Sequence, residues 1–568
     1  MASSVGHEDA PAVEASVVPS IGNTRLHLII VGLWLCLFVS AMDTTIITTA
    51  LFRISSDFYA LDQGPWLVTA YLLAYNSFLM ITAKLSDVWG LRTILLAFNG
   101  FFLVFSMACS AAQTMNQLIV FRALQGIGGS ALYSLVFVAI MKLIVPDKIA
   151  FYSGIISSVF ALANLSGPLL GGAISDHTNW RLIFWLNGPI IGIAMAILLF
   201  TMPSMNDNKS TRERLRGFDV IGGVLSVCWP VPLLFALQEA GVSYDWNSGI
   251  IIGTLVTAFV LLTLFIAYEA WASYKTKLDV IFPARFVTNP APALLLFSMF
   301  LLGMPFMSMF VQLPQRFQGV NFASAERAGI LLLPVSLTTP VGAVLGGLLN
   351  KKLPAEYILL LGTAIISIGI GLLSNLPVDN GIADATYGYE IITGVGLGLA
   401  STPYYIMLYT SVEEKDVPIG TGILNMLRTL GGAVAVAICS TLHNSVLRDD
   451  LSVFLNAEQV AGVKASGAFI ARLPEQARIE LGRVFGRSYN KQFKVIMAFA
   501  LLNFLVAIAL AVVRKKNGIF GKMPVRTLEN EFTKTDREHE GEKEQTAMAA
   551  AAESTQETEA PTQQQNKS

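Results

Sequence analysis

Apolar runs of about 20 residues recur about fourteen times along this chain of 568 residues, and they limit its fold more than any other feature. Inside a bilayer the backbone groups must bond within their own segment, so runs of this length cross as α-helices. Hydrophobic residues make up 54% of the chain and charged residues 14%, with a mean hydropathy of +0.60. The sequence therefore predicts an all-α polytopic membrane protein. The runs start near Leu26, Trp66, Arg92, Leu118, Phe151, Leu182, Val220, Ile250, Ala291, Ala328, Tyr357, Glu390, Ile419 and Phe493.

Basic residues gather in every second loop, which gives the expected orientation. Lysine and arginine are favoured on the cytoplasmic side, so both termini should lie in the cytosol. A loop at 444–490 should be extracellular, and the polar segment 514–568 should be a disordered cytoplasmic tail. The basic groups are Lys84 and Arg92, Lys142 and Lys148, Lys209 to Arg216, Lys275 and Lys277, Lys351 and Lys352, and Arg514 to Lys516.

Several function classes are disfavoured by the sequence. It lacks the glycine-rich G-x-x-x-x-G-K-S/T nucleotide loop and the H-E-x-x-H and G-x-S-x-G patterns of metalloproteases and hydrolases. We therefore expect neither an enzyme nor a cofactor or metal site. The net charge of −1 gives no reason to expect a nucleic-acid partner.

Asp43 lies inside the first apolar run. A charge at mid-membrane costs roughly 2.5 to 3.5 kcal/mol on insertion scales, so an ionisable residue there is a candidate functional group. In the fourth run, Arg122 and Gln125 accompany Gly126 in the segment F-R-A-L-Q-G. At about 1.5 Å per residue, Asp43 and Arg122 both fall in the outer half of the membrane, so an ion pair between them is geometrically allowed.

Two glycine-containing motifs mark places where helices turn or pack closely. After the second run, Asp87 and Gly90 form a short cytoplasmic turn, in which the glycine permits a tight bend. The fifth run carries a long array that should kink the helix and let a neighbour approach closely. Its members are Gly154, Ala163, Gly167, Pro168, Gly171 and Gly172.

These motifs together resemble the major facilitator superfamily, and within it the fourteen-span drug:proton antiporters, especially fungal toxin and drug efflux pumps. Further segments of the resemblance are M-D-T-T-I at 42–46, W-R-L-I-F-W-L-N at 180–187 and L-N-M-L-R-T-L-G-G at 424–432. The chain departs from the usual pattern at Ala83, at Leu91-Arg92 and at Ala163, which weakens the turn motif most.

The resemblance implies a domain plan and roles for several residues. A six-helix bundle at 26–203 follows a cytoplasmic tail at 1–25. A loop and two inserted helices occupy 204–288, and a second six-helix bundle follows at 289–513. The resemblance implicates Asp43 and Arg122 in proton coupling, and the array around Gly167 and Pro168 in antiport.

Five residues are candidates for a substrate cavity between the bundles, and all but Gln125 have a simpler explanation. Methionine-rich apolar surfaces suit promiscuous binding, but lipid-facing or packed side chains are the common alternative. An arginine in the thirteenth run either contacts substrate or bonds backbone carbonyls. The candidates are Gln125, Phe300, Met304, Met307 and Arg428.

The sequence thus predicts a monomeric, proton-driven exporter of small amphipathic compounds such as toxins, drugs or secondary metabolites, in the plasma membrane of a fungal cell. The vacuolar membrane is the alternative location. A proton-symport importer of a nutrient or siderophore, and a sensor that moves no substrate, are the alternative functions.

Overall fold

The computed structural model describes residues 22–521 apart from 144–145, 204–218, 241–243, 277, 279, 351, 380, 414–415, 452, 466–468 and 471. The elements in these residues are helices, with one isolated β-bridge between Ala240 and Tyr244. Twelve helical segments are long and apolar enough to cross a membrane. Helices α2 (Gly64–Trp89) and α5 (Pro146–His177), with 26 and 32 residues, are not among the twelve but have the length of a span.

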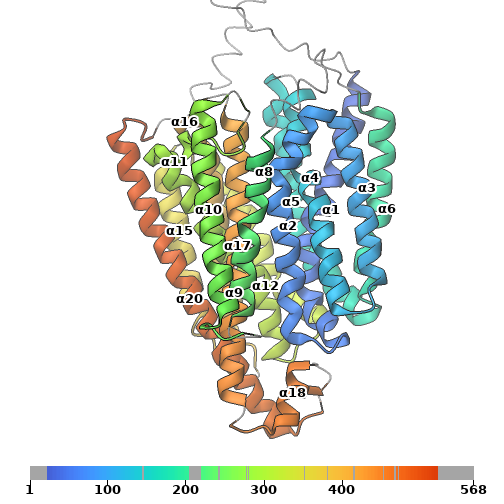
Figure 1. The fold of residues 1–568 in the computed structure, drawn as a ribbon. Helices are drawn as coiled ribbons and strands as arrows, with labels where there is room; N and C mark the ends of the chain where they lie inside the picture. Colours follow the sequence, from blue (N-terminus) through green and yellow to red (C-terminus); the bar gives the residue numbers. More distant parts are fainter. Residues whose placement is uncertain are drawn as a thin grey trace, which may run out of the picture. The chain divides into compact units, whose positions relative to one another are not determined.

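The first six long helices pack on one another. α1 contacts α5 and α6, while α4 contacts α2 and α3. Figure 1 shows these helices side by side in blue to teal. We call them the N-terminal group. Besides α2 and α5 they are α1 (Asn23–Asp57), α3 (Leu91–Ala111), α4 (Met115–Leu143) and α6 (Arg181–Thr201).

A second set of helices forms the C-terminal group. α12 packs on α17 and α20, and α16 packs on α14 and α15. Helix α13 runs almost directly into α14, and together they make one span. The members are α12 (Pro290–Gly319), α13 (Ala325–Leu331), α14 (Leu333–Leu349), α15 (Ala355–Leu373), α16 (Ala385–Ser411), α17 (Val417–Leu451) and α20 (Glu475–Lys516).

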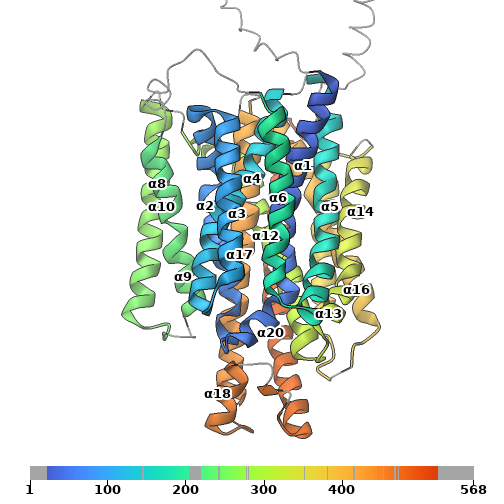
Figure 2. The ribbon, with the colours of Figure 1, turned by 90° about the vertical axis from the view of Figure 1, so that its right-hand side faces the viewer.

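Three helices between the groups in sequence form the inserted pair of spans. α8 (Val220–Cys228) and α9 (Pro230–Glu239) make one span, broken at Trp229 where Pro230 opens the next helix. α10 (Gly249–Lys275) is the other span and is mostly exposed. Figure 2 shows this pair at one side of the other helices.

The two ends of the helix assembly are distinguished by short contacts. Arg25 Nε donates to the Thr201 carbonyl at 2.7 Å, so α1 begins where α6 ends. The indole nitrogen of Trp180 donates to Asp57 at 2.9 Å at the other end. That other end also carries α18 (Ala457–Ala465), as Figure 1 shows, and we call it the α18 end. The opposite end is the α1 end.

Segment 444–490 is largely helical where it is described. It contains the end of α17, then α18 and the first turns of α20. α20 therefore starts at Glu475, well before the apolar run near Phe493. Charged side chains support this extension, because Arg483 pairs with Glu480 at 3.1 Å and Arg487 pairs with Asp450 at 3.0 Å.

The expected start of the tail at 514 is too early. α20 continues to Lys516, and the chain is described to Gly521. Arg514 is buried and its Nε lies 2.6 Å from Glu356 on α15. Buried charges are stable only when paired, and this pair holds the end of α20 in the fold. The rest of the predicted tail, 522–568, and the predicted N-terminal tail up to residue 21 lie outside the described residues.

Candidate functional site: a buried ion pair inside the N-terminal group

Asp43 lies in the interior of the N-terminal group and pairs with Arg122. Its Oδ2 is 2.5 Å from Nη1 of Arg122, and both side chains are 1% exposed. α1 carries the acid and α4 carries the base, two helices that are in contact. The ion pair that the sequence allowed is therefore present.

The second oxygen of the Asp43 carboxylate accepts from two amides. Gln125 Nε2 donates to Oδ1 at 3.0 Å, and Asn187 Nδ2 donates to the same atom at 3.1 Å. Asn187 is on α6 and also donates to the Ser106 hydroxyl at 2.9 Å. Gln125 is thus part of the ion-pair network within the N-terminal group.

The Arg122 guanidinium is held on several sides. It donates to Gln125 Oε1 at 2.8 Å and, through Nε, to the Leu67 carbonyl at 3.2 Å. Its central carbon lies 4.2 Å from the centre of the Tyr71 ring, a cation–π distance. Asn187 and Tyr71 were missed as site residues, although a polar Asn in an apolar run is the signal that marks Asn187.

This arrangement links the charge of Asp43 to the packing of four other helices. Removing one partner of a buried pair costs roughly 3 to 5 kcal/mol, because the other charge is left uncompensated. Neutralising Asp43 by a proton would likewise leave Arg122 without its counter-ion.

The glycine array of α5 packs directly on α1 beside Asp43. A Cβ at Gly167 would overlap Thr45 Oγ1, and one at Gly171 would overlap the Ile46 carbonyl. The Thr49 hydroxyl donates to the carbonyl of Pro168 at 3.2 Å. Only residues without a side chain allow this approach, so the array fits the close packing expected from its sequence.

α5 also contacts the C-terminal group. A Cβ at Gly172 would overlap the Ala325 carbonyl, and one at Gly329 would overlap the Pro168 carbonyl. Beyond these residues, Asp176 accepts from the backbone N–H groups of Ala325 and Glu326 at 3.2 and 2.7 Å. α5 is therefore in contact both with the helix of Asp43 and with α13, at the α18 end.

The turn and array residues are described to different extents. Gly90 joins α2 to α3 with a φ of +87°, a conformation that favours glycine. A Cβ at Gly126 would overlap the Tyr71 carbonyl, so α4 and α2 are in close contact there. Asp87 lies on α2 and Gly154 on α5, but their side-chain surroundings are outside the described residues.

The candidate cavity residues on α12 lie in helix packing. Met304 and Met307 are buried, with Met307 against Gly432 of α17, and Gly431 packs on the Phe300 carbonyl. Arg428 on α17 lies over the Phe306 ring at 5.1 Å and acts electrostatically on Tyr75 and Tyr133 of the N-terminal group. Arg428 is thus the candidate that faces the other group, while a substrate role for any of these residues stays a prediction.

The fold and the buried pair define a polytopic membrane transporter. The model of the Major Facilitator Superfamily matches residues 33–436, so this chain belongs to that family and is not an enzyme. Its fold is shared by a bacterial homologue of the human lysosomal transporter Spinster, solved in an inward-facing and unoccupied conformation. That likeness has a TM-score of 0.64 and 15% identity, covering 87% of this chain and 98% of the other.

Relatives similar in sequence include fungal and bacterial transporters. The MFS-type transporter FPY5 of Fusarium mangiferae is 38% identical, over 86% of this chain and 83% of the relative. The rubrofusarin-specific efflux pump aurT of Gibberella zeae is 30% identical, over 86% and 89%. Multidrug resistance protein 3 of Bacillus subtilis is 32% identical, over 77% and 82%.

Proposed function

We propose that this protein is a proton-coupled exporter of small amphipathic compounds, such as toxins, drugs or fungal secondary metabolites. Asp43 is the proton-linked carboxylate and Arg122 is its partner. The observation that carries the proposal is the fully buried Asp43–Arg122 pair. Relatives named efflux pumps support export as the direction.

The packing of α5 supports a link between the proton on Asp43 and the movement of the two helix groups. Protonation of Asp43 releases Arg122 and disturbs α1, the helix on which Gly167 and Gly171 pack. α5 also contacts α13, so a shift of α1 against α5 is transmitted to the interface between the two groups. Access to a substrate cavity then alternates as the groups rock.

The proposed orientation places the α1 end in the cytosol and the α18 end outside. The basic residues Arg92, Lys275 and Lys516 all lie near helix termini at the α1 end. We propose a monomer in the plasma membrane, exchanging protons for a small-molecule substrate.

The proposal is tested with purified protein in vesicles that carry an imposed pH gradient, using rubrofusarin and ethidium as probes. We expect Asp43→Asn to insert normally but to lose gradient-driven export at least tenfold, because Asn cannot carry the proton. Arg122→Ala should be impaired at least as much, since it leaves a buried carboxylate unpaired.

Asp245→Asn is the matched control, because Asp245 is an exposed carboxylate between α9 and α10. It should export as the unmodified protein does. Wild-type rates in well-folded Asp43→Asn would show that Asp43 has only a structural role. Uptake toward the cytosolic face would indicate an importer. A sensor would move neither probe, and cells lacking the protein would then retain no metabolite.

A further inference from the structure

Glu390 is a buried carboxyl group that the Asp43 site does not use. It lies on α16 in the C-terminal group and is 0% exposed. Among the residues that the structure describes, neither of its carboxylate oxygens has a hydrogen-bond partner. Asp43, in contrast, has three donors.

In the described residues of α14 and α15, the two helices that pack most closely on α16, no counter-ion lies near Glu390. The sequence of α14 contains no titratable side chain, and those of α15, Glu356 and Tyr357, lie at the opposite, α1 end. α16 itself adds Tyr387 and Tyr389 near this position.

Arg316 on α12, which also contacts α16, is bonded elsewhere. It donates to the carbonyls of Pro377 and Gly486 at 2.7 and 3.3 Å and to Asn490 at 3.1 Å. A carboxylate without a donor or a cation in an apolar interior is far less stable than the neutral acid. Glu390 is therefore better accommodated in this conformation as the neutral acid than as the carboxylate.

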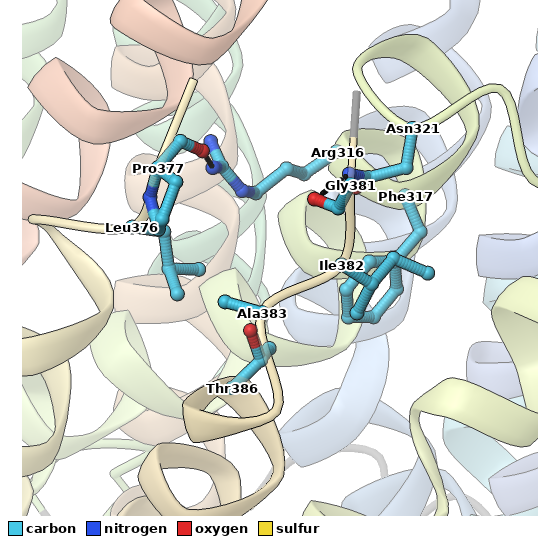
Figure 3. A pocket seen from close by; sticks show the side chains of 9 residues that line it. All are labelled: Arg316, Phe317, Asn321, Leu376, Pro377, Gly381, Ile382, Ala383 and Thr386. Carbon is cyan, nitrogen blue, oxygen red and sulfur yellow. Dashed lines mark hydrogen bonds between the residues drawn. The ribbon is translucent and has the colours of Figure 1, made fainter. Parts of the chain in front are cut away.

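A small pocket at the α18 end reaches the same face of α16. Its lining includes Arg316, Pro377 and Thr386, which Figure 3 shows around a common space. Thr386 precedes Glu390 by four residues, so the two side chains lie about one helical turn apart on one face. Glu390 is not among the lining residues, so the pocket ends about one helical turn from the buried carboxyl.

We propose that Glu390 is a second proton-carrying carboxylate, in the C-terminal group, loaded from the α18 end through the pocket at Thr386. This inference rests on the proposed proton-coupled function. One proton binds the carboxylate from the solution at that end. It leaves when the movement of α14 against α16 opens the site toward the other side. Asp43 and Glu390 then carry protons in different helix groups.

The first test is chemical and needs no substrate. Dicyclohexylcarbodiimide reacts with protonated carboxyl groups in apolar surroundings, and mass spectrometry locates the modified residue. We expect Glu390 to be modified in the full-length protein in vesicles, and the modification to fall at least tenfold as the pH at the α18 end is raised. Labelling that does not change with pH, or no labelling at Glu390, would overturn the proposal.

The second test is transport of ethidium and rubrofusarin driven by an imposed pH gradient. Glu390→Gln has nearly the shape of the protonated acid, so it should fold, and we expect it to lose gradient-driven export at least tenfold. Glu390→Asp keeps a titratable group and should retain part of the activity with a shifted pH profile. Thr386→Leu should slow gradient-driven export by filling the pocket.

Glu480→Gln is the control, since Glu480 is a part-exposed carboxylate on α20 at the same end. Export by Glu390→Gln at the wild-type rate and with the wild-type pH profile would show a permanently neutral packing group, and would leave the proposed function intact. If the unmodified protein ignored the pH gradient while still exporting a probe, proton coupling as a whole would be wrong, and this inference with it.

Discussion

Among the described residues, two fully buried ion pairs join helices in different parts of the molecule. Asp43 and Arg122 join α1 to α4, while Glu356 and Arg514 join α15 to the last turn of α20. Arg514 also donates to Ser411 and Thr410, at 2.5 and 2.7 Å. The first pair stands inside apolar runs, so its charges are visible in the sequence. The second lies at the borders of runs, where a charge looks like an ordinary loop residue.

We expect Arg514→Ala to lower the stability of the protein by about 3 to 5 kcal/mol, because Glu356 would remain buried without its counter-ion. The double variant Glu356→Gln with Arg514→Met should recover most of that loss, since neither charge is then left alone. Thermal unfolding in detergent measures both. Equal melting temperatures for Arg514→Ala and the unmodified protein would argue that the pair contributes nothing.

At the scale of helices, α5 is the element that connects the candidate site with the other helix group. Its glycines face α1 on one side and α13 on the other. Pro168 lies within the helix and its carbonyl accepts from Thr49. Because both contacts are on one helix, we propose that a small movement of α1 against α5 also displaces α13.

We expect Gly167→Leu to reduce export at least tenfold with little loss of inserted protein, because the new side chain would push α5 away from Thr45. Gly192→Leu on α6 is the matched control, since a Cβ there would meet nothing within 4 Å. Export is measured in vesicles and divided by the amount of protein. Normal export by Gly167→Leu would mean that this contact does not take part in the transport movement.

At the scale of the whole molecule, the two ends carry different side chains. α18 and the charged first turns of α20 lie at one end, and Lys515 and Lys516 close α20 at the other. From the positive-inside rule we propose that the second of these ends faces the cytosol.

Cysteine labelling tests that orientation. Val453→Cys, at a residue that is 82% exposed, should react with a membrane-impermeant thiol reagent added to intact cells. Lys516→Cys should react only after the membrane is opened. The native cysteines Cys36, Cys109 and Cys439 are buried and add little background. The reverse pattern would invert the proposed topology.

The sequence by itself determined the membrane fold and the centre of the candidate site. Run length fixes a helical span, because bilayer thickness and the backbone hydrogen-bond requirement leave few alternatives. A charge inside such a run is costly enough to stand out, which is why Asp43 and Arg122 could be predicted as partners. The glycines of α5 were predictable for the same reason, since close packing in a membrane needs small residues.

Only the tertiary structure decided which polar groups have partners and which do not. Asn187 reaches Asp43 from α6, 144 residues away in sequence, and no local pattern gives that contact. Glu390 opens an apolar run and looks like a border residue, yet α14 and α15 bury it without a donor. Arg514 looks like part of a tail until Glu356 is found beside it. Which polar groups pair with each other depends on how helices distant in sequence pack together. The free-energy cost of a charge in lipid depends only on the apolar run that contains it.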